Sequence, residues 1–315
     1  MQHWNSYWNT TKSLNSFAEG EHSQGYTGDI AEFWRNVFVN TQPNATLLDL
    51  ATGNGGLAVL AKQSNINFNV FASDAAKIDP LAMFNSNDDI YPLLNKIQFF
   101  ADMPSESLQF EDNQFDLVIS QFGFEYAHPR EAIQQIFRVL KPKGRFIALI
   151  HHQDSFISED CRQGIKVLAC MMAVGGLFDQ LASFGRFCQS IPDKNQLTTA
   201  EQTRFKQKNA ELLQLFKGLQ QDCKNEVELD WFNLLAKDLV PLIMNWRQTN
   251  EAKIIQARQS LEHFHLRLQD QLDAAWSPEY AEEMKKLAQK HKANSHCKPF
   301  DISQGKLCWL FEVNL

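Results

Sequence analysis

Two neighbouring features near residue 50 could bind the charged groups of a small ligand. Residues 47–57 read LLDLATGNGGL, an apolar run that leads into a turn containing Gly53 and Gly55. Glycine lets the chain turn sharply and lets a ligand approach the backbone, and the free N–H groups where a helix begins attract a carboxylate or a phosphate. An ordinary strand-to-helix turn could have the same composition. The segment alone therefore indicates either a plain turn or a nucleoside-binding loop.

Asp49 narrows the kind of ligand that such a loop would hold. The turn lacks the full G-x-G-x-x-G pattern of dinucleotide-binding loops. Asp49 lies in the apolar run just before the turn, where its carboxylate could hold an ammonium group. An amino-acid ligand has this group and a nicotinamide dinucleotide lacks it. The pattern favours a ligand that carries both a nucleoside and an amino acid.

Two more aspartates follow apolar runs. Asp74 comes directly after residues 70–73 and could accept both ribose hydroxyl protons, in charge-assisted bonds worth about 1.5–3 kcal/mol each. Asp102 could accept the adenine amino group, with Met103 covering the ring. The alternatives are a helix N-cap at Asp74 and a capped turn before Pro104.

Proton-accepting groups are expected where two later strands end. Glu125 and Tyr126 follow a predicted strand at 115–120, and His151 and His152 lie at the end of another. Because side chains alternate along a strand, only one of the two histidines should point into a site. The candidate catalytic residues are Glu125, Tyr126 and His151, although either histidine could equally be a surface or sheet-edge residue.

The order of predicted elements indicates a doubly wound α/β domain. Strands are expected at 46–50, 68–73, 97–101, 115–120 and 145–151, and helices at 29–40, 55–63, 79–85, 89–95 and 129–140, with a turn at 141–144. Strands and helices in alternation form a parallel sheet with helices on both faces. Ligands of such sheets bind at the carboxyl ends of the strands, where the candidate residues lie.

After residue 152 the pattern becomes helical. Amphipathic stripes replace strands until a terminal hairpin at 298–302 and 307–313. We therefore predict a seven-stranded, mostly parallel sheet with a large helical insertion before an antiparallel C-terminal hairpin. The predicted domains are a loosely ordered N-terminal arm or lid at 1–28, an α/β domain at 29–154 plus 277–315, and a helical cap at 155–276. The apolar stretch 167–178 could line a pocket, although core packing is the favoured interpretation.

Composition excludes several classes of protein. The net charge of −7 and the pI of about 5.7 disfavour nucleic acid as a partner. The cysteines form no C-x-x-C pair, and the spacing of the histidines indicates no shared metal. The chain starts without an apolar leader, and its longest apolar run is shorter than the roughly 20 residues of a membrane span. We expect a cytoplasmic protein with no bound metal and no membrane span.

Together these motifs resemble the class I S-adenosylmethionine-dependent methyltransferases, and most of all those grouped with the ubiquinone and menaquinone biosynthesis enzymes. Residues 49–55, DLATGNG, look like the glycine motif of that family. Residues 116–118, DLV, and 138–146, RVLKPKGRF, look like its later blocks. The resemblance covers about residues 29–152 and the terminal hairpin. Two departures are Ala51, where a glycine is commoner, and residues 75–95, which match no block.

The resemblance implies a Rossmann-like methyltransferase fold, an S-adenosyl-L-methionine cofactor and a role for each matched position. The side chain of Asp49 and the backbone at Ala51 and Gly53, with Gly55 in the same turn, would hold the methionine part. The other implied cofactor contacts are Asp74 to the ribose, Asp102 and Met103 to the adenine, and Gln121 near the sulfonium. Ala75 is a further candidate contact, and Tyr26 could close over the cofactor with its aromatic face toward the cationic sulfonium. For Tyr26, simple packing is an equal alternative. We expect a small-molecule acceptor under the helical cap; the alternatives are a protein or RNA acceptor, or a non-catalytic binding module.

Overall fold

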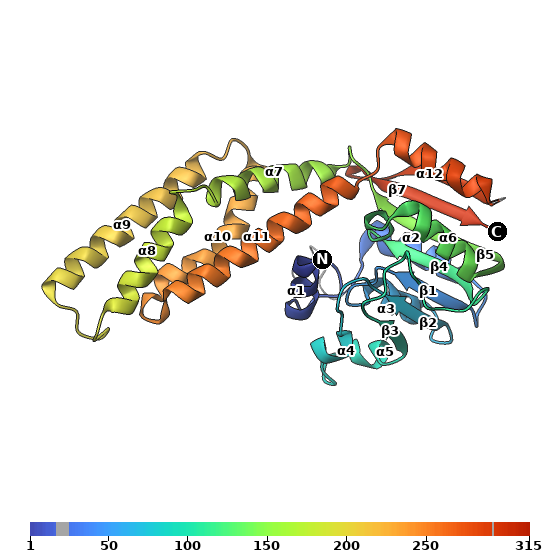
Figure 1. Cartoon of the computed structure of the whole chain (residues 1–315), viewed down its shortest axis with the longest axis horizontal. Coiled ribbons are helices and arrows are strands. Elements are labelled where there is room, and N and C mark those ends of the chain that lie inside the picture. Colours follow the sequence, from blue (N-terminus) through green and yellow to red (C-terminus); the bar gives the residue numbers. More distant parts are fainter. Residues whose placement is uncertain (17–24, 292) are drawn as a thin grey trace. The chain divides into compact units, whose positions relative to one another are not determined.

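The computed structural model describes residues 1–16, 25–291 and 293–315, and these form two compact units. Met1–Ser158 and Asp273–Leu315 make up the first unit, which contains the sheet, and Glu159–Leu272 make up the second, which is helical. Figure 1 shows the sheet of the first unit and the long helices of the second. Each unit is described by itself below.

The first unit is built on one seven-stranded sheet in the order β3-β2-β1-β4-β5-β7-β6. Strands β1 to β5 pair in parallel, and β7 is antiparallel to both of its neighbours. This arrangement confirms the predicted fold. The strands are β1 (Thr46–Leu50), β2 (Asn69–Ser73), β3 (Ile97–Phe100), β4 (Phe115–Gln121), β5 (Leu140–His151), β6 (Asn294–Ile302) and β7 (Gly305–Asn314).

Apolar alternation along β1 explains why the sheet carries a core on each face. Leu47 belongs to a buried cluster shared with α2 (Gly28–Val39) and α3 (Gly56–Ser64). Leu48, on the other face, belongs to a cluster shared with α6 (Pro129–Val139) and α12 (Pro278–Lys290). Helices therefore cover both faces, and only the strand ends are left for a ligand.

The predicted turn at 141–144 lies inside a longer strand. β5 begins at Leu140, and its pairing with β4 shifts register between Phe115 and Leu117. Lys143 has a positive φ of 69°. The four residues therefore bulge out of the strand instead of separating a helix from it, and pairing resumes at Arg145.

The first part of the N-terminal arm is ordered, so the prediction of a loose arm is wrong for the described residues. Gln2–Thr10 form α1, in which His3 and Trp8 are buried. The polar sequence of the arm suggested disorder because the contacts that order it are tertiary. The amide of Asn54 donates to the carbonyl oxygens of Thr11 and Ser13, at 3.2 and 2.9 Å. Residues 17–24, which also belong to the predicted arm, lie outside the described part of the chain.

Two very short helices, α4 (Pro80–Met83) and α5 (Tyr91–Leu94), connect β2 to β3.

A 3-10 turn at Phe124–Tyr126 follows β4 and sets Glu125 at the carboxyl edge of the sheet. This turn is held by Ser120, whose Oγ donates to the Leu50 carbonyl and accepts the Phe124 N–H, each at 3.0 Å.

The helical unit contains α8 to α10 and most of α7 and α11. A tryptophan fixes one crossing: the Trp231 indole packs on Gly164, where an added Cβ would lie 2.7 Å away, and donates to Asp160 at 3.1 Å. The helices are α7 (Phe156–Met171), α8 (Leu177–Ser190), α9 (Thr199–Gln221), α10 (Glu226–Met244) and α11 (Glu251–Ala274). Among the described residues, no helix combines the length and the apolarity needed to span a bilayer.

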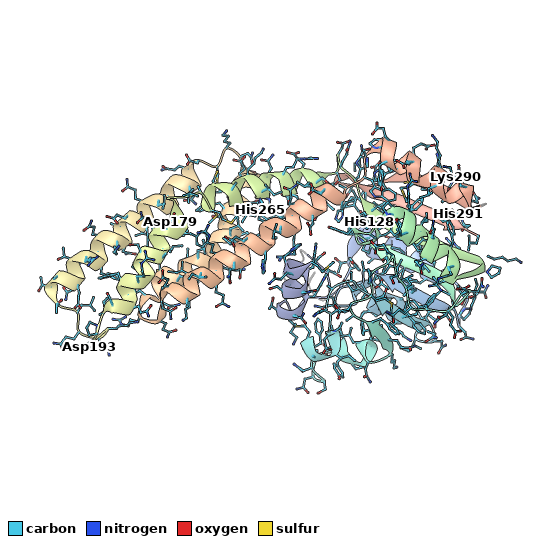
Figure 2. The ribbon with its side chains drawn as sticks, in the orientation of Figure 1. His128, Asp179, Asp193, His265, Lys290 and His291 are labelled. Atoms are coloured by element: carbon cyan, nitrogen blue, oxygen red, sulfur yellow. The ribbon has the colours of Figure 1, made fainter. Side chains whose placement is uncertain are left out.

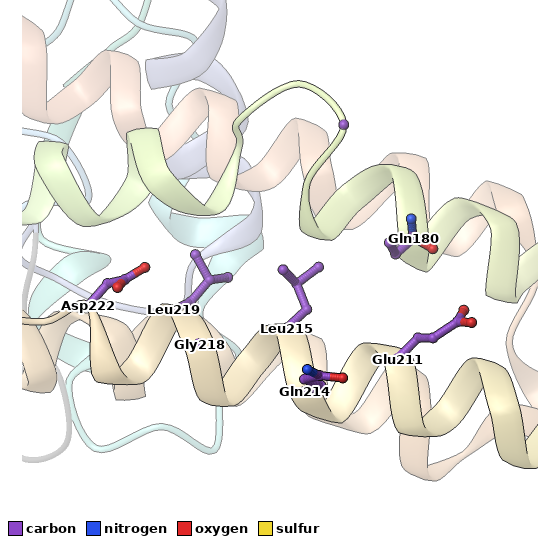
Figure 3. Close-up of a pocket in the computed structure, with 8 residues that line it drawn as sticks. Gln180, Glu211, Gln214, Leu215, Gly218, Leu219 and Asp222 are labelled. Carbon is purple, nitrogen blue, oxygen red and sulfur yellow. The ribbon is translucent and has the colours of Figure 1, made fainter.

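An open cavity of about 430 Å³ in the helical unit lies between the start of α8 and α9 (Figure 3). Of the apolar stretch 167–178, Gly175 lines this cavity, whereas Leu168, Met171 and Leu177 are fully buried in the core. The rest of the lining comes from Gln180 and α9 and mixes Leu215 and Leu219 with amides and carboxylates. The stretch is therefore mainly core, in agreement with the favoured interpretation.

Ser277 caps the start of α12, as its sequence predicts. Its Oγ accepts the Tyr280 N–H at 3.2 Å, and Pro278 occupies the first helical position. Replacing Ser277 with Ala should lower the free energy of unfolding by about 1 kcal/mol, because one N–H at the helix start loses its acceptor. Urea unfolding followed by circular dichroism measures the loss. Ser260→Ala, in the middle of α11, is the matched control, and an equal loss in both variants would contradict the capping role.

Candidate active site

The turn after β1 adopts the conformation that its glycines allow. Ala51, Gly53 and Gly55 all have positive φ, of 53°, 56° and 91°. Such values suit glycine and strain alanine. The methyl group of Ala51 fits because residue 123 is glycine: a Cβ there would lie 2.5 Å from the Ala51 Cβ. Gly123 therefore compensates for the departure at Ala51, a pairing that the sequence did not reveal.

Side chains of the protein itself fill the space beside two of these glycines. A Cβ on Gly53 would lie 2.4 Å from the Trp8 indole, and one on Gly55 would lie 2.9 Å from the Phe99 ring. From the sequence alone, this space is expected to admit a ligand. In the structure α1 takes that side of Gly53, so Trp8 is a part of the site that sequence reasoning missed.

Asp49 is almost fully buried at the end of β1. Its Oδ2 accepts the Thr52 hydroxyl at 2.6 Å. Burial raises the pKa of this carboxyl to about 7, and the nearby charge of Asp74 adds to the rise. Burial raises the pKa of the Tyr26 phenol, and the charge of the nearby Asp49 adds to the rise. A buried carboxylate in this state gains most from a cationic partner.

Asp74 lies at the end of β2 and holds the glycine turn. Its two oxygens accept the N–H groups of Gly53 at 2.8 Å and Ala76 at 2.7 Å. Burial raises its carboxyl pKa to about 6, although both hydrogen bonds oppose the rise. Each oxygen keeps a second lone pair, so the carboxylate can still accept two hydroxyl protons.

Backbone hydrogen bonds place the adenine candidates, Asp102 and Met103, beside Asp74. Met103 is buried, and its N–H donates to the Asp74 carbonyl at 2.8 Å. Asp102 has a positive φ of 53°, donates its N–H to the Ala76 carbonyl at 3.2 Å and is exposed. The half-buried Ala75 lies between Asp74 and Ala76, the two residues whose carbonyl oxygens accept these bonds. The structure thus brings the predicted ribose and adenine residues together.

Gln121, at the end of β4, is buried with a donor group that has no partner. Its Oε1 accepts the Trp34 indole N–H at 2.5 Å, which leaves the amide Nε2 facing inward without a hydrogen bond among the described residues. The Ser73 hydroxyl, at the end of β2, is also buried and unpaired there. Unsatisfied buried polar atoms are costly, so such atoms at a sheet edge point to a ligand that pairs with them.

The three candidate catalytic residues also come together at the same edge. His151 Nδ1 lies 2.7 Å from Glu125 Oε1, and the Tyr126 ring meets the His151 ring edge-on at 6.2 Å. His152 points the other way: it stacks on Trp309 at 4.4 Å, and its Nδ1 accepts the Asp154 N–H at 2.9 Å. The two histidines therefore point to opposite faces, as strand alternation predicts: His151 lies beside Glu125, and Trp309 of β7 covers His152.

The remaining histidines offer no metal centre. Figure 2 labels His128 at the start of α6, His265 on α11 and His291 at the end of α12. His291 packs against Phe137, with ring centroids 4.8 Å apart. In the part of the chain that the structure describes, no three His, Cys, Asp or Glu side chains are grouped to hold a metal ion.

Comparison with known proteins agrees with the fold. Residues 48–148 match the family model described as "Methyltransferase domain". The ubiquinone/menaquinone biosynthesis C-methyltransferase UbiE of Rickettsia typhi is 32% identical over 125 residues, which are 38% of this chain and 50% of that protein. UbiE of Geotalea daltonii is 26% identical over 168 residues, which are 51% of this chain and 70% of that protein. The chain thus spans about half the length of the first of these relatives.

Solved structures are also similar to this chain. A putative S-adenosyl-L-methionine-dependent methyltransferase from Methanococcus maripaludis is 25% identical, with a TM-score of 0.31, over 39% of this chain and 54% of that one. Geranyl diphosphate C-methyltransferase from Streptomyces coelicolor is 14% identical, with a TM-score of 0.36, over 47% of this chain and 63% of that one. The fold assignment rests on the strand order described above.

The sheet order is that of the seven-stranded Rossmann-like fold predicted from the sequence. Within it, residues 48–148, which contain the glycine turn, Asp74 and the end of β4, match the family model of the methyltransferase domain.

Proposed function

We propose that the chain is an S-adenosylmethionine-dependent methyltransferase that acts on a small molecule. The observation that carries this proposal is the pair of buried carboxylates, Asp49 and Asp74, at the ends of adjacent strands. The carboxylate of Asp49 suits an ammonium group, and that of Asp74 suits the hydroxyls of a ribose. The relatives with about 30% identity are named as C-methyltransferases of ubiquinone and menaquinone biosynthesis, which supports a small acceptor.

The residues present fit the proposed cofactor. Asp49 would accept the ammonium group, and the unpaired amide of Gln121 would donate to the carboxylate of the methionine part. Asp74 would accept the ribose hydroxyls while it holds Gly53, and Met103 would cover the adenine. We propose cofactor contacts for Ala51, Gly55, Ala75, Asp102 and Tyr26 as well, as the sequence predicts.

The protein's contribution to the reaction would be alignment. When bound, the cofactor supplies an electrophilic methyl group on a sulfonium. Holding an acceptor atom in line with that group can supply several kcal/mol of the barrier reduction. The family match ends at residue 148, so the helical unit lies outside it. We propose that residues 155–276, the predicted cap, select the acceptor.

The first test is thermal unfolding with S-adenosylmethionine, S-adenosylhomocysteine or NAD. A ligand present at about 100 times its Kd should stabilise the unit that contains the sheet by about 2.7 kcal/mol. We expect this shift with both adenosyl ligands and none with NAD. A shift with NAD alone would exclude the proposed function.

A further inference from the structure

The side chains of Glu125 and His151 form a buried pair at the ends of β4 and β5. Their exposed fractions are 0% and 5%. Glu125 Oε1 lies 2.7 Å from the ring Nδ1 of His151 and also accepts the backbone N–H of the same residue at 2.8 Å. One carboxylate oxygen therefore accepts the main-chain N–H of His151 and also lies against its ring, whose Nδ1 makes no hydrogen bond among the described residues.

Aromatic side chains hold the imidazole in one plane. Phe122 stacks on it at 4.3 Å with an angle of 22° between the rings, and Tyr126 meets its edge. Trp4 of α1 contacts Tyr126 in turn, with centroids 5.7 Å apart. With Nδ1 directed at Glu125 and one face covered by Phe122, the opposite nitrogen, Nε2, is the ring atom left for a reactant.

Structural stability does not account for this pair. Burying a carboxylate is costly, and an apolar pair of similar volume would stabilise a core at least as well. Moreover, Glu125 Oε2 and His151 Nδ1 are both buried without a hydrogen bond among the described residues. The titratable neighbours are Tyr126, beside the ring, and Cys308, which pairs with His151 across β5 and β7. Burial and the charge of Glu125 raise the pKa of the Cys308 thiol, so it stays neutral.

The position of the pair connects it with the proposed methyl-transfer site. Gln121 pairs with Leu149 of β5, two residues before His151. Both side chains thus lie at the carboxyl edge of adjacent strands, where a doubly wound sheet binds its ligands.

We propose that His151 Nε2 takes a proton from the methyl acceptor and that Glu125 is the positioning residue that holds His151 for this step. The proposal rests on the proposed function. It assigns the acceptor to a class: the attacking atom carries a proton at neutral pH, as in a hydroxyl group or an acidic C–H group. A thioether or a tertiary amine, which needs no base, is outside this class.

The step balances as follows. The proton of the acceptor passes to Nε2, and the electron pair of the broken bond becomes available to the attacking atom. That atom forms a bond to the methyl carbon, while the carbon–sulfur bond breaks and its pair goes to sulfur. The products are the methylated acceptor, S-adenosylhomocysteine and an imidazolium on His151, which Glu125 stabilises until the proton leaves to water.

Two probe acceptors test the proposal with the full chain. Phenol carries a proton on its attacking oxygen at neutral pH, whereas pentafluorophenol, an acceptor of the same kind, is already ionised and needs no base. The ratio of phenol to pentafluorophenol methylation should fall by at least 100-fold in His151→Asn, and by at least tenfold in Glu125→Gln with an altered pH profile. Affinity for S-adenosylhomocysteine should change less than threefold in both variants. His128→Asn, an exposed histidine at the start of α6, is the control.

A spectroscopic measurement checks the positioning role separately. In ¹⁵N-histidine spectra of the complex with S-adenosylhomocysteine, neutral His151 should carry its proton on Nδ1, and Glu125→Gln should convert it to a mixture of tautomers. Equal losses with both probes, or an unchanged tautomer, would overturn the proposal. So would a wild type that binds S-adenosylhomocysteine yet fails to methylate phenol. Absence of binding would instead refute the proposed function.

Discussion

Replacing Asp74 with Asn should weaken the binding of S-adenosylhomocysteine by about 100-fold or more. The carboxylate would accept two ribose hydroxyls in charge-assisted bonds worth about 1.5–3 kcal/mol each, and loss of the charge removes most of that energy. Asparagine preserves the shape and an acceptor for one of the two backbone N–H groups, whereas alanine preserves neither, and circular dichroism checks that the variant keeps its fold. Isothermal titration calorimetry measures the affinity directly.

The design of this variant matters because Asp74 has a second task. Its oxygens hold the Gly53 and Ala76 N–H groups, so Asp74→Ala would leave two buried donors unpaired and loosen the turn. Asp112→Asn is the matched control, since Asp112 is exposed and pairs with Arg138 at 2.9 Å. A normal affinity in Asp74→Asn, with an unchanged fold, would refute the ribose assignment.

The sheet could be predicted closely because local sequence determines it. β1 matches its predicted bounds at both ends, since an apolar run is cut off by a turn that only small residues can make. The same logic located the ends of β2 and β4, and with them Asp74 and Gln121. Strand alternation also predicted that His151 and His152 point to opposite faces, because the parity of a strand is fixed by geometry.

The contacts of α1 could not be predicted, because they join residues far apart in sequence. Gly53 leaves room for the Trp8 indole, which is why Trp8 can be buried. Asn54 holds the arm because its amide donates to the carbonyl oxygens of Thr11 and Ser13. A polar segment with a few aromatic residues has no helical stripe to read. The Glu125–His151 contact is similar: the sequence named both residues, but the 2.7 Å distance between them depends on the 3-10 turn after β4.

The two buried aspartates, Asp49 and Asp74, have carboxyl pKa values raised by burial, and this gives the site a pH dependence. For a carboxyl whose pKa is raised by folding, the native state binds its proton more tightly than the unfolded state. The stability of the ligand-free protein should therefore fall as pH rises from about 4 to about 7, and level off above. Ligand binding should respond in the opposite direction, because the ammonium group needs ionised Asp49.

The affinity for S-adenosylhomocysteine should accordingly rise with pH until Asp49, with its pKa of about 7, is ionised. Below that value each pH unit should cost up to tenfold in affinity, and binding near pH 7 should release a proton. Calorimetry from pH 5.5 to 8.5 in buffers of different ionisation enthalpy measures both effects. Asp49→Asn should lose the titration near pH 7 and bind at least tenfold more weakly at pH 8, whereas Asp74→Asn should keep that titration. An affinity that stays constant across this range would show that Asp49 does not hold the ammonium group, and the case for an amino-acid-bearing cofactor would lose its main support.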